Sequence, residues 1–411
     1  MKICIIGGGL CGLTAARELA DNAEVTLVER RPILGGCLAS YAIDGYSIEQ
    51  YYHHCFAGDS RLLNLLKELK IADRLEWLRG TTGYYAESTA YPLTTPTEIL
   101  KYPYLSLTDK ARLAVLTLRS KRFDLESLDT VTAKEFILNN LGSGVYTSFF
   151  EPLLRSKFGE RSDEVSAAWL ISRIAIRSNR GTGGERLGYL RGGFQCLIDR
   201  LREDLIQKGC SIATGRTIQA IERDGGRWLV DGEPYDIVLS TIPPQETARI
   251  SGMAIDPIPY QGAACMTLAL SRDVTDGIYW LNMKDRAPYG AVVSHTNFAP
   301  PEWYNGDRLI YLASYFAGRL PGTFEKTMLT DFCRRFGVQE REVLWHRMAV
   351  DPYAGPIYTT GLRSQIPDYE QHGLFMAGMF SLPNYPERSM EGSVVAAEEV
   401  ARRIHTRAAH E

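Results

Sequence analysis

The chain begins with the stretch KICIIGGGLCGLTAARELA (residues 2–20), and this stretch decides the fold. Residues 2–6 are mostly apolar, as in a buried strand, and residues 13–20 continue as a helix. Gly7, Gly9 and Gly12 between them fit the G-x-G-x-x-G pattern. The first glycine allows a tight turn, the second lets the backbone approach a pyrophosphate, and the third lets the helix pack on the strand. The stretch predicts a dinucleotide-binding βαβ unit whose helix N-terminus faces the anion.

An acidic residue follows at the position that such a unit requires. Glu29 ends the next predicted strand, residues 24–28, about twenty residues beyond the glycines. A carboxylate at this point accepts hydrogen bonds from an adenosine ribose. The glycine pattern alone would be weak evidence, but here it comes with its strands and its acid.

Two further segments point to a flavin. RRPILGG (residues 30–36) holds a second glycine pair, and LFMAG (residues 374–378) followed by SMEGSV (residues 389–394) predicts a strand and then a helix. These segments resemble the flavoprotein class of amine oxidases, protoporphyrinogen oxidases and phytoene desaturases. In that class the C-terminal helix points its N-terminus at the flavin, where the positive end of the helix dipole stabilises the reduced ring. A C-terminal helix that only closes the domain is the alternative.

The resemblance implies FAD as the cofactor, held by both ends of the chain. Cys37 stands where these enzymes usually carry an arginine. No cysteine lies in the C-terminal segment where some amine oxidases attach their flavin, so we expect FAD to be bound non-covalently. The residues expected to contact it are Gly7, Gly9, Leu10, Cys11, Gly12, Glu29, Arg30, Gly35, Gly36, Cys37, His53, Ile218, Gly378, Met379, Ser389 and Met390.

The expected fold class is α/β, with a Rossmann-like FAD-binding domain interleaved with an α+β substrate domain. LRGGFQCL (residues 190–197) resembles the point where the chain of this class re-enters its cofactor domain. Alternating runs after it predict a small antiparallel meander. The FAD-binding domain is expected at residues 1–60, 189–249 and 353–411, and the substrate domain at residues 61–188 and 250–352.

Apolar periodicity divides the substrate domain into a helical piece and a strand-rich piece. Helices are expected at residues 61–69, 109–122, 132–141 and 145–154, and strands at residues 266–270, 289–293 and 309–312. These strands would form a sheet that roofs the substrate cavity.

A candidate catalytic residue lies in EQYYHHCF (residues 49–56). This segment resembles a stretch of the UDP-galactopyranose mutases, which use FAD without net oxidation. On that match His54 takes the position of the histidine that lies against the isoalloxazine ring, and Tyr52 replaces the family's glycine. The structural alternative is that these histidines only bind buried carbonyl groups.

Substrate-binding candidates come from two other segments. ISRIAIR (residues 171–177) resembles a mutase stretch whose arginine holds a diphosphate. Arg173 and Arg177 are four residues apart, so on a helix both face one way, and guanidinium groups suit a phosphate or a carboxylate. A solvated basic face is the alternative. Tyr353 and Tyr358 lie in a segment similar to the oxidases and desaturases, and they are the other candidates.

Composition limits the remaining classes. The chain has 411 residues, of which 45% are hydrophobic, and a formal net charge of −3, so we expect a small-molecule substrate and no nucleic acid. No stretch approaches a membrane span, and a cytoplasmic protein is expected. The eight cysteines lack metal-binding spacing, so no metal is expected.

One basic segment raises the question of peripheral membrane contact. The predicted helix 109–122 could touch an anionic membrane, although a solvated helix face is the simpler interpretation. Its basic residues are Lys110, Arg112, Arg119, Lys121 and Arg122.

The function expected from these observations is that of an FAD-dependent oxidoreductase. It would take a hydride from a C–H bond of a small molecule onto flavin N5, and oxygen or another acceptor would reoxidise the flavin. One alternative is a redox-neutral isomerase similar to UDP-galactopyranose mutase, acting on a sugar nucleotide. A second alternative is a structural protein that binds FAD without catalysis.

Overall fold

One half of the molecule, which contains both ends of the chain, is built on a six-stranded sheet. The computed structural model describes residues 1–177 and 185–409. The strand order of this six-stranded sheet is β19-β20-β13-β1-β2-β9. All neighbouring strands are parallel except β19 and β20, which are antiparallel. The strands are β1 (Lys2–Ile6), β2 (Glu24–Glu29), β9 (Ser211–Thr214), β13 (Ile237–Ser240), β19 (Glu370–Gln371) and β20 (Leu374–Met376). The predicted Rossmann-like α/β fold is confirmed.

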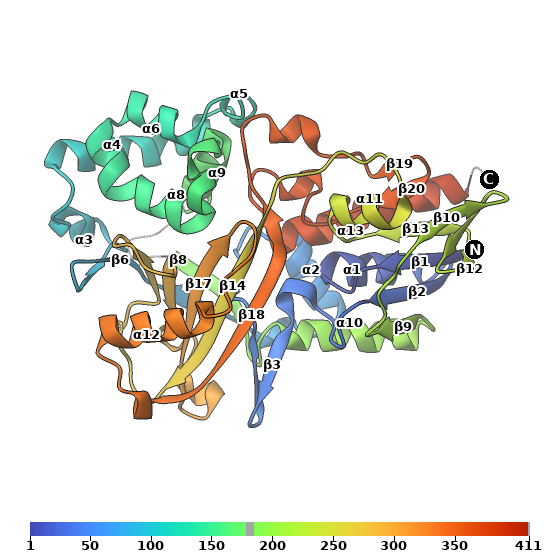
Figure 1. The fold of residues 1–411 in the computed structure, drawn as a ribbon, viewed down its shortest axis with the longest axis horizontal. Helices are drawn as coiled ribbons and strands as arrows, with labels where there is room; N and C mark the ends of the chain where they lie inside the picture. The colour runs from blue at the N-terminus through green and yellow to red at the C-terminus, as the bar shows by residue number, and fades with distance from the viewer. Residues whose placement is uncertain (178–184, 410–411) are drawn as a thin grey trace.

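The apolar run at residues 2–6 explains why β1 lies in the middle of this sheet. Ile5 pairs with Leu27 on one side and with Leu239 on the other, and all three are fully buried. Strands that are covered on both faces are apolar throughout. Helix α1 (Leu10–Leu19) packs between α13 (Met390–Ala408) and α10 (Gln195–Gln207), so the two ends of the chain lie side by side (Figure 1).

Smaller elements complete this half. The predicted meander is present as a three-stranded antiparallel sheet, although Ile218 precedes its first strand. Helix α2 packs against α13. These elements are β10 (Ile221–Asp224), β11 (Arg227–Val230), β12 (Glu233–Tyr235), α11 (Pro244–Ser251), α2 (Ser60–Glu68) and the hairpin of β3 (Ser40–Ile43) and β4 (Tyr46–Glu49).

A seven-stranded sheet forms the core of the second half. Its order is β18-β14-β17-β16-β15-β6-β7, and α12 (Phe324–Phe336) covers one face. The strands are β6 (Thr82–Ala86), β7 (Thr89–Pro92), β14 (Tyr260–Leu270), β15 (Trp280–Met283), β16 (Ala291–Ser294), β17 (Arg308–Phe316) and β18 (Val343–Pro356). β18 is an edge strand, which is why it tolerates Pro352. The expected domain boundary at residues 352 and 353 falls inside this continuous strand.

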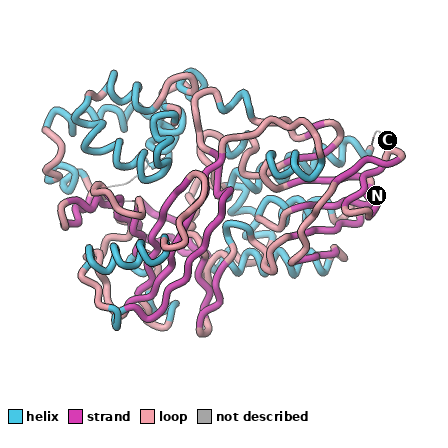
Figure 2. The backbone as a smooth tube through the Cα atoms, viewed as in Figure 1, coloured by secondary structure: helices cyan, strands magenta, loops and turns pink. Residues whose placement is uncertain are grey.

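Short helices form the far end of the molecule, opposite the two termini (Figure 2). They are α3 (Pro96–Lys101), α4 (Leu107–Arg119), α5 (Leu125–Leu128), α6 (Ala133–Asn140), α7 (Ser143–Val145), α8 (Glu151–Phe158) and α9 (Ala167–Arg177). The single helix predicted at residues 145–154 is wrong in one respect, because a π-helical turn at Tyr146–Phe150 separates α7 from α8. Pro152, in the first turn of α8, lacks the N–H that a continuous α-helix needs.

A buried chain of polar side chains ties the two halves together. Glu49, at the end of β4, is fully buried and accepts hydrogen bonds from the Tyr189 hydroxyl at 2.7 Å and from the Phe194 amide. Tyr304 donates to Tyr189 at 3.4 Å, and its hydroxyl lies 2.7 Å from His295 Nε2. Tyr189 belongs to β8 (Glu185–Leu190), which pairs with β5 (Leu75–Gly80). Because each of these polar groups has a partner, their burial fixes the orientation of the halves.

Candidate functional site

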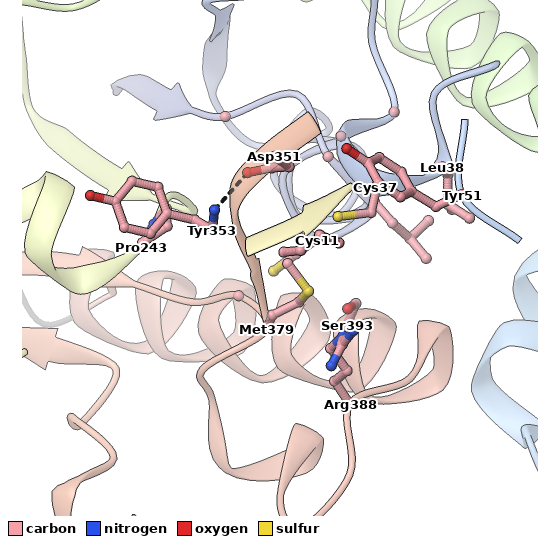
Figure 3. Close-up of a pocket in the computed structure, with 18 of the residues that line it drawn as sticks. Cys11, Cys37, Leu38, Tyr51, Pro243, Asp351, Tyr353, Met379, Arg388 and Ser393 are labelled. Atoms are coloured by element: carbon pink, nitrogen blue, oxygen red, sulfur yellow. Dashed lines mark hydrogen bonds between the residues drawn. The ribbon is translucent and has the colours of Figure 1, made fainter. Parts of the chain in front are cut away.

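A cavity of about 420 Å³ lies between the carboxyl ends of the parallel strands and the seven-stranded sheet. Its lining comes from the glycine-rich loop after β1, from the ends of β2 and β13, and from β14, β17, α8, α9 and the start of α13. This is the edge at which open α/β sheets bind their ligands. Figure 3 shows Arg388 and Ser393 on the α13 side of the cavity, with Cys37 and Tyr51 across from them.

The glycine-rich loop forms a cradle in this cavity. A Cβ atom on Gly12 would lie 2.0 Å from the Gly7 carbonyl oxygen, so helix and strand meet there at their closest approach. A Cβ atom on Gly9 would meet only the Gly36 Cα, at 4.0 Å. None of the described side chains caps α1, so the N–H groups of its first turn remain available to an anion. The loop therefore fits a pyrophosphate.

The second glycine pair lies against the first. The Gly35 amide donates to the Gly8 carbonyl at 2.8 Å, and Gly35 and Gly36 both adopt positive φ angles, of 110° and 56°. A Cβ atom on Gly36 would lie 3.2 Å from the Gly9 Cα. Only glycine allows two backbone segments to approach in this way at such angles.

Glu29 holds the two glycine segments in place. Its carboxylate accepts hydrogen bonds from the Gly8 amide at 2.7 Å and from the Arg31 amide at 2.8 Å. The side chain is buried and lines the cavity together with Arg30 and Ile218. A carboxylate that is already fixed by two amides is well placed to accept further hydrogen bonds from a ribose.

The two histidines line the next part of the cavity. His53 Nδ1 lies 2.7 Å from the Tyr51 carbonyl oxygen, and burial lowers the pKa of His53 to about 4, so the ring is neutral and donates this bond. His54 packs edge-on against Phe56 and Tyr279, and the Tyr279 hydroxyl lies 3.4 Å from its Nδ1. His54 also lines the cavity, and its catalytic role stays a prediction.

The start of α13 closes this part of the site. Ser389 caps the helix by accepting a hydrogen bond from the Gly392 amide at 2.9 Å. Met379, Met390 and Ser393 line the cavity beside it. Glu391 turns away and accepts hydrogen bonds from the amides of Arg61 and Leu62 at the start of α2, at 3.0 and 2.8 Å. Glu391 therefore has a structural role at the start of α2. The N-terminus of α13 itself faces the cavity.

A wall of buried charges lines the other side of the cavity. Arg173 of α9 lies 3.4 Å from the Glu387 carboxylate, and Lys157 of α8 lies 3.9 Å from it. The side chains of these three residues are only 14–16% exposed. Arg388 completes the group, which we call the cationic wall. Three cations around one carboxylate leave the wall with a net charge of +2.

Two donors of the cationic wall have no partner. Arg388 Nη1 and Arg173 Nε are buried, and neither makes a hydrogen bond to any other described residue. The Arg388 side chain packs directly on Gly355. A Cβ atom at position 355 would lie 2.6 Å from the guanidinium carbon, so only glycine fits beside this arginine. Buried donors normally have partners, and an anion in the cavity would supply them.

Tyr315 of β17 joins the cationic wall to the seven-stranded sheet. Its hydroxyl lies 3.0 Å from that of Tyr52, and Lys157 Nζ lies 5.2 Å from its ring centre. Burial raises the pKa of Tyr315, but the charges of Lys157 and Arg388 outweigh this effect, and the pKa falls to about 8. Tyr52 keeps its proton because burial raises its pKa well above the usual value.

The structure separates the expected substrate residues. Arg173 belongs to the cationic wall, whereas the side chain of Arg177 lies outside the described part of the structure. Tyr353 lines the cavity, and its hydroxyl donates to Glu246 at 3.1 Å. Tyr358 does not line the cavity: it is 2% exposed, and its hydroxyl donates to the Asn384 carbonyl at 3.0 Å. A direct contact between Tyr358 and substrate is therefore not supported.

Comparison with known proteins decides the family. Residues 10–405 match the family described as flavin containing amine oxidoreductase. The chain belongs to this family. Coproporphyrinogen III oxidase of Mycobacterium tuberculosis is 25% identical over 283 residues, which are 61% of this chain and 61% of that enzyme. A 15-cis-phytoene desaturase of Synechococcus elongatus is 43% identical over 79 residues, which are 19% of this chain and 17% of that enzyme.

Two solved structures share the fold of this protein along nearly its whole length. A putative protoporphyrinogen oxidase from Exiguobacterium has a TM-score of 0.77 at 21% identity and covers 99% of both chains. Reduced UDP-galactopyranose mutase has a TM-score of 0.77 at 16% identity and covers 98% of this chain and 95% of its own. Family membership makes FAD the cofactor. The glycine cradle, Glu29 and the α13 N-terminus would hold it, and it would supply an acceptor for a hydride.

Within residues 1–177 and 185–409, no group of three or more His, Cys, Asp or Glu side chains is placed to hold a metal ion. In the same part of the chain, no helix is both long and apolar enough to cross a membrane.

We expect FAD to be released when the protein is denatured. Three cysteines line the cavity, Cys11, Cys37 and Cys265. Burial raises the pKa of all three thiols, to about 12 for Cys11 and Cys37, so they stay protonated and are poor nucleophiles. After acid precipitation the yellow colour should therefore remain in the supernatant. A yellow pellet would contradict this expectation and would indicate a covalent bond to a cavity residue.

Proposed function

We propose that this protein is an FAD-dependent oxidoreductase that takes a hydride from a C–H bond of an anionic small molecule. The hydride would pass to flavin N5, the substrate would lose a proton, and oxygen or another acceptor would reoxidise the flavin. The contribution of the protein is to align the C–H bond and to exclude water.

The proposal rests on the cationic wall. It lines the same cavity as the glycine cradle, and it contains two buried donors without partners among the described residues. The cavity is also lined by the small side chains Ala263, Ala264 and Ala313, which leave room for a substrate. A carboxylate or phosphate group beside Arg173 would satisfy the free donors, and the rest of the molecule would extend over the alanines.

The charge of the wall distinguishes the substrates of the relatives. Coproporphyrinogen III carries carboxylates, whereas phytoene is an uncharged hydrocarbon that offers no partner to buried arginines. Leaving charged donors unpaired in the complex would cost several kcal/mol, on the order of 1–3 per group. A carboxylate-bearing substrate is therefore favoured over an apolar polyene.

Product analysis with three candidate substrates tests the proposal. Coproporphyrinogen III, phytoene and UDP-galactopyranose would each be incubated with the FAD-loaded protein, with and without oxygen. We expect oxidation of an anionic substrate that requires an electron acceptor. Turnover without any acceptor, and only after reduction of the flavin, would favour the isomerase instead, and oxidation of phytoene alone would contradict an anionic substrate.

The charge of the cationic wall should also change with pH. Below about pH 8 Tyr315 is neutral and the wall carries a charge of +2, and above that pH the phenolate reduces it to +1. Binding of an anion should therefore weaken as the pH rises through about 8, with KM increasing about tenfold. Tyr315→Phe should abolish this rise. Identical pH profiles for both proteins would contradict the assignment to Tyr315.

A further inference from the structure

Helix α4 carries large apolar side chains on two opposite sides. Leu116 is 5% exposed and packs into the core with Phe136 and Phe150 of the neighbouring helices. Leu107 and Leu118, in contrast, are 76% and 81% exposed. The helix start is well defined, because Ser106 and Asp109 form a capping box there. The exposed leucines therefore belong to a stable helix and not to a frayed end.

The exposed apolar residues form one stripe. Leu107, Ala111, Val115 and Leu118 are all exposed and follow each other at intervals of four, four and three residues, which places them on one face of the helix. Leu100 of α3 is 59% exposed and lies next to it, because Lys110 of α4 donates to the Leu100 carbonyl at 2.7 Å. Four of the twelve large apolar side chains that are exposed in the described residues thus fall between residues 100 and 118.

Basic residues flank the apolar stripe. Residues 100–122 contain six basic residues and one acidic residue, although the whole chain has a formal net charge of −3. The acidic one, Asp109, lies 3.6 Å from Arg112. Lys101, Arg119 and Arg122 are exposed, and no described carboxylate forms an ion pair with Arg119 or Arg122. The net charge of residues 100–122 is therefore opposite in sign to that of the whole chain.

We propose that the apolar stripe of α4, with Leu100 and the flanking cations, binds the surface of an anionic lipid bilayer. Leucines that insert below the headgroups and cations that meet lipid phosphates are the chemistry of a helix that lies in a membrane interface. The position also fits, because α3 and α4 lie at one end of the long axis, away from the termini (Figure 1). An acidic protein surface would satisfy the cations but would leave the leucines exposed. This proposal does not depend on the proposed reaction.

Vesicle flotation tests the proposal. Vesicles of phosphatidylcholine with phosphatidylglycerol should carry the FAD-loaded protein to the top of a gradient, and vesicles of phosphatidylcholine alone should not. Leu107→Ser with Leu118→Ser should weaken binding by about a hundredfold, and Arg119→Gln with Arg122→Gln by about thirtyfold. High salt should also weaken it, because salt screens the cations. The matched control is Ile206→Ser with Leu344→Ser, two residues that are each 52% exposed elsewhere on the surface.

Several results would overturn the proposal. Failure of the wild type to float with either vesicle, or equal flotation of the stripe variants and the wild type, would do so. Equal binding to both vesicle types would remove the role of the cations. A dimer in sedimentation that Leu107→Ser with Leu118→Ser abolishes, without vesicle binding, would assign the stripe to a second copy of the chain. Because all four substituted leucines and arginines are exposed, the melting temperature should stay unchanged in every variant.

Discussion

Gly9→Val is expected to give a folded protein that contains no flavin. A Cβ atom on Gly9 meets no atom closer than 4.0 Å, and its φ angle of −77° is one that valine adopts easily. The protein alone therefore tolerates the change. The branched side chain, however, would occupy the cradle in which the pyrophosphate must lie, and FAD affinity should fall by at least about a hundredfold. The measurement is the visible spectrum of the purified variant, together with its circular dichroism.

Two control variants separate this effect from damage to the fold. Gly58→Val places the same side chain where no atom lies within 4 Å, outside the cavity, and this variant should stay yellow. Gly12→Ala should instead unfold the domain, because its Cβ atom would lie 2.0 Å from the Gly7 carbonyl oxygen. Bound flavin in folded Gly9→Val protein would show that the cradle is not the cofactor site.

Arg173→Ala is expected to raise KM far more than it lowers kcat. If Arg173 binds an anionic group distant from the reacting carbon, its loss removes binding that the ground state and the transition state share. A hydrogen bond to a charged group contributes about 1.5–3 kcal/mol, which corresponds to a roughly ten- to hundredfold increase in KM. Arg173→Lys should recover little, since a point charge does not reproduce the guanidinium fork.

Arg161→Ala is the matched control for this variant. Arg161 lies between α8 and α9, forms an ion pair with Glu164 three residues later and does not line the cavity. Its KM should equal that of the wild type. Equal KM values for Arg173→Ala and the wild type, with unchanged melting temperatures, would remove the argument for an anionic substrate and favour an apolar one.

The cofactor half of the site could be predicted because its signals are local. Turn glycines, the acid at the end of β2 and the helix at the C-terminus each follow from a short stretch of sequence. Gly7, Gly9 and Gly12 lie where the pattern places them, and their spacing has a steric reason that the structure makes explicit. Resemblance then connected the two ends of the chain, which lie next to each other as α1 and α13.

The cationic wall could not be predicted because its residues come together only in the folded chain. Lys157, Tyr315 and Arg388 belong to three segments that are distant in sequence. Of the wall, Arg173 alone was predicted, from the segment at residues 171–177. The pair Glu387 and Arg388 directly before the α13 segment is a second local signal, because two charges there precede a helix that faces a flavin. The continuous strand β18 was not among the predicted strands. It contains Pro352 and Pro356, which an edge strand accommodates.

Anaerobic reduction of the bound flavin would show whether an anionic substrate gives its hydride to the flavin of this protein. FAD-loaded protein would be mixed with a carboxylate-bearing substrate such as coproporphyrinogen III in the absence of oxygen, and its visible absorption would be followed. We expect the yellow colour to bleach in one turnover and to return on admission of an acceptor. Arg173→Ala should require a higher substrate concentration for the same bleaching. Bleaching by phytoene but by no anionic compound, or equal concentration dependence in Arg173→Ala and the wild type, would contradict this expectation.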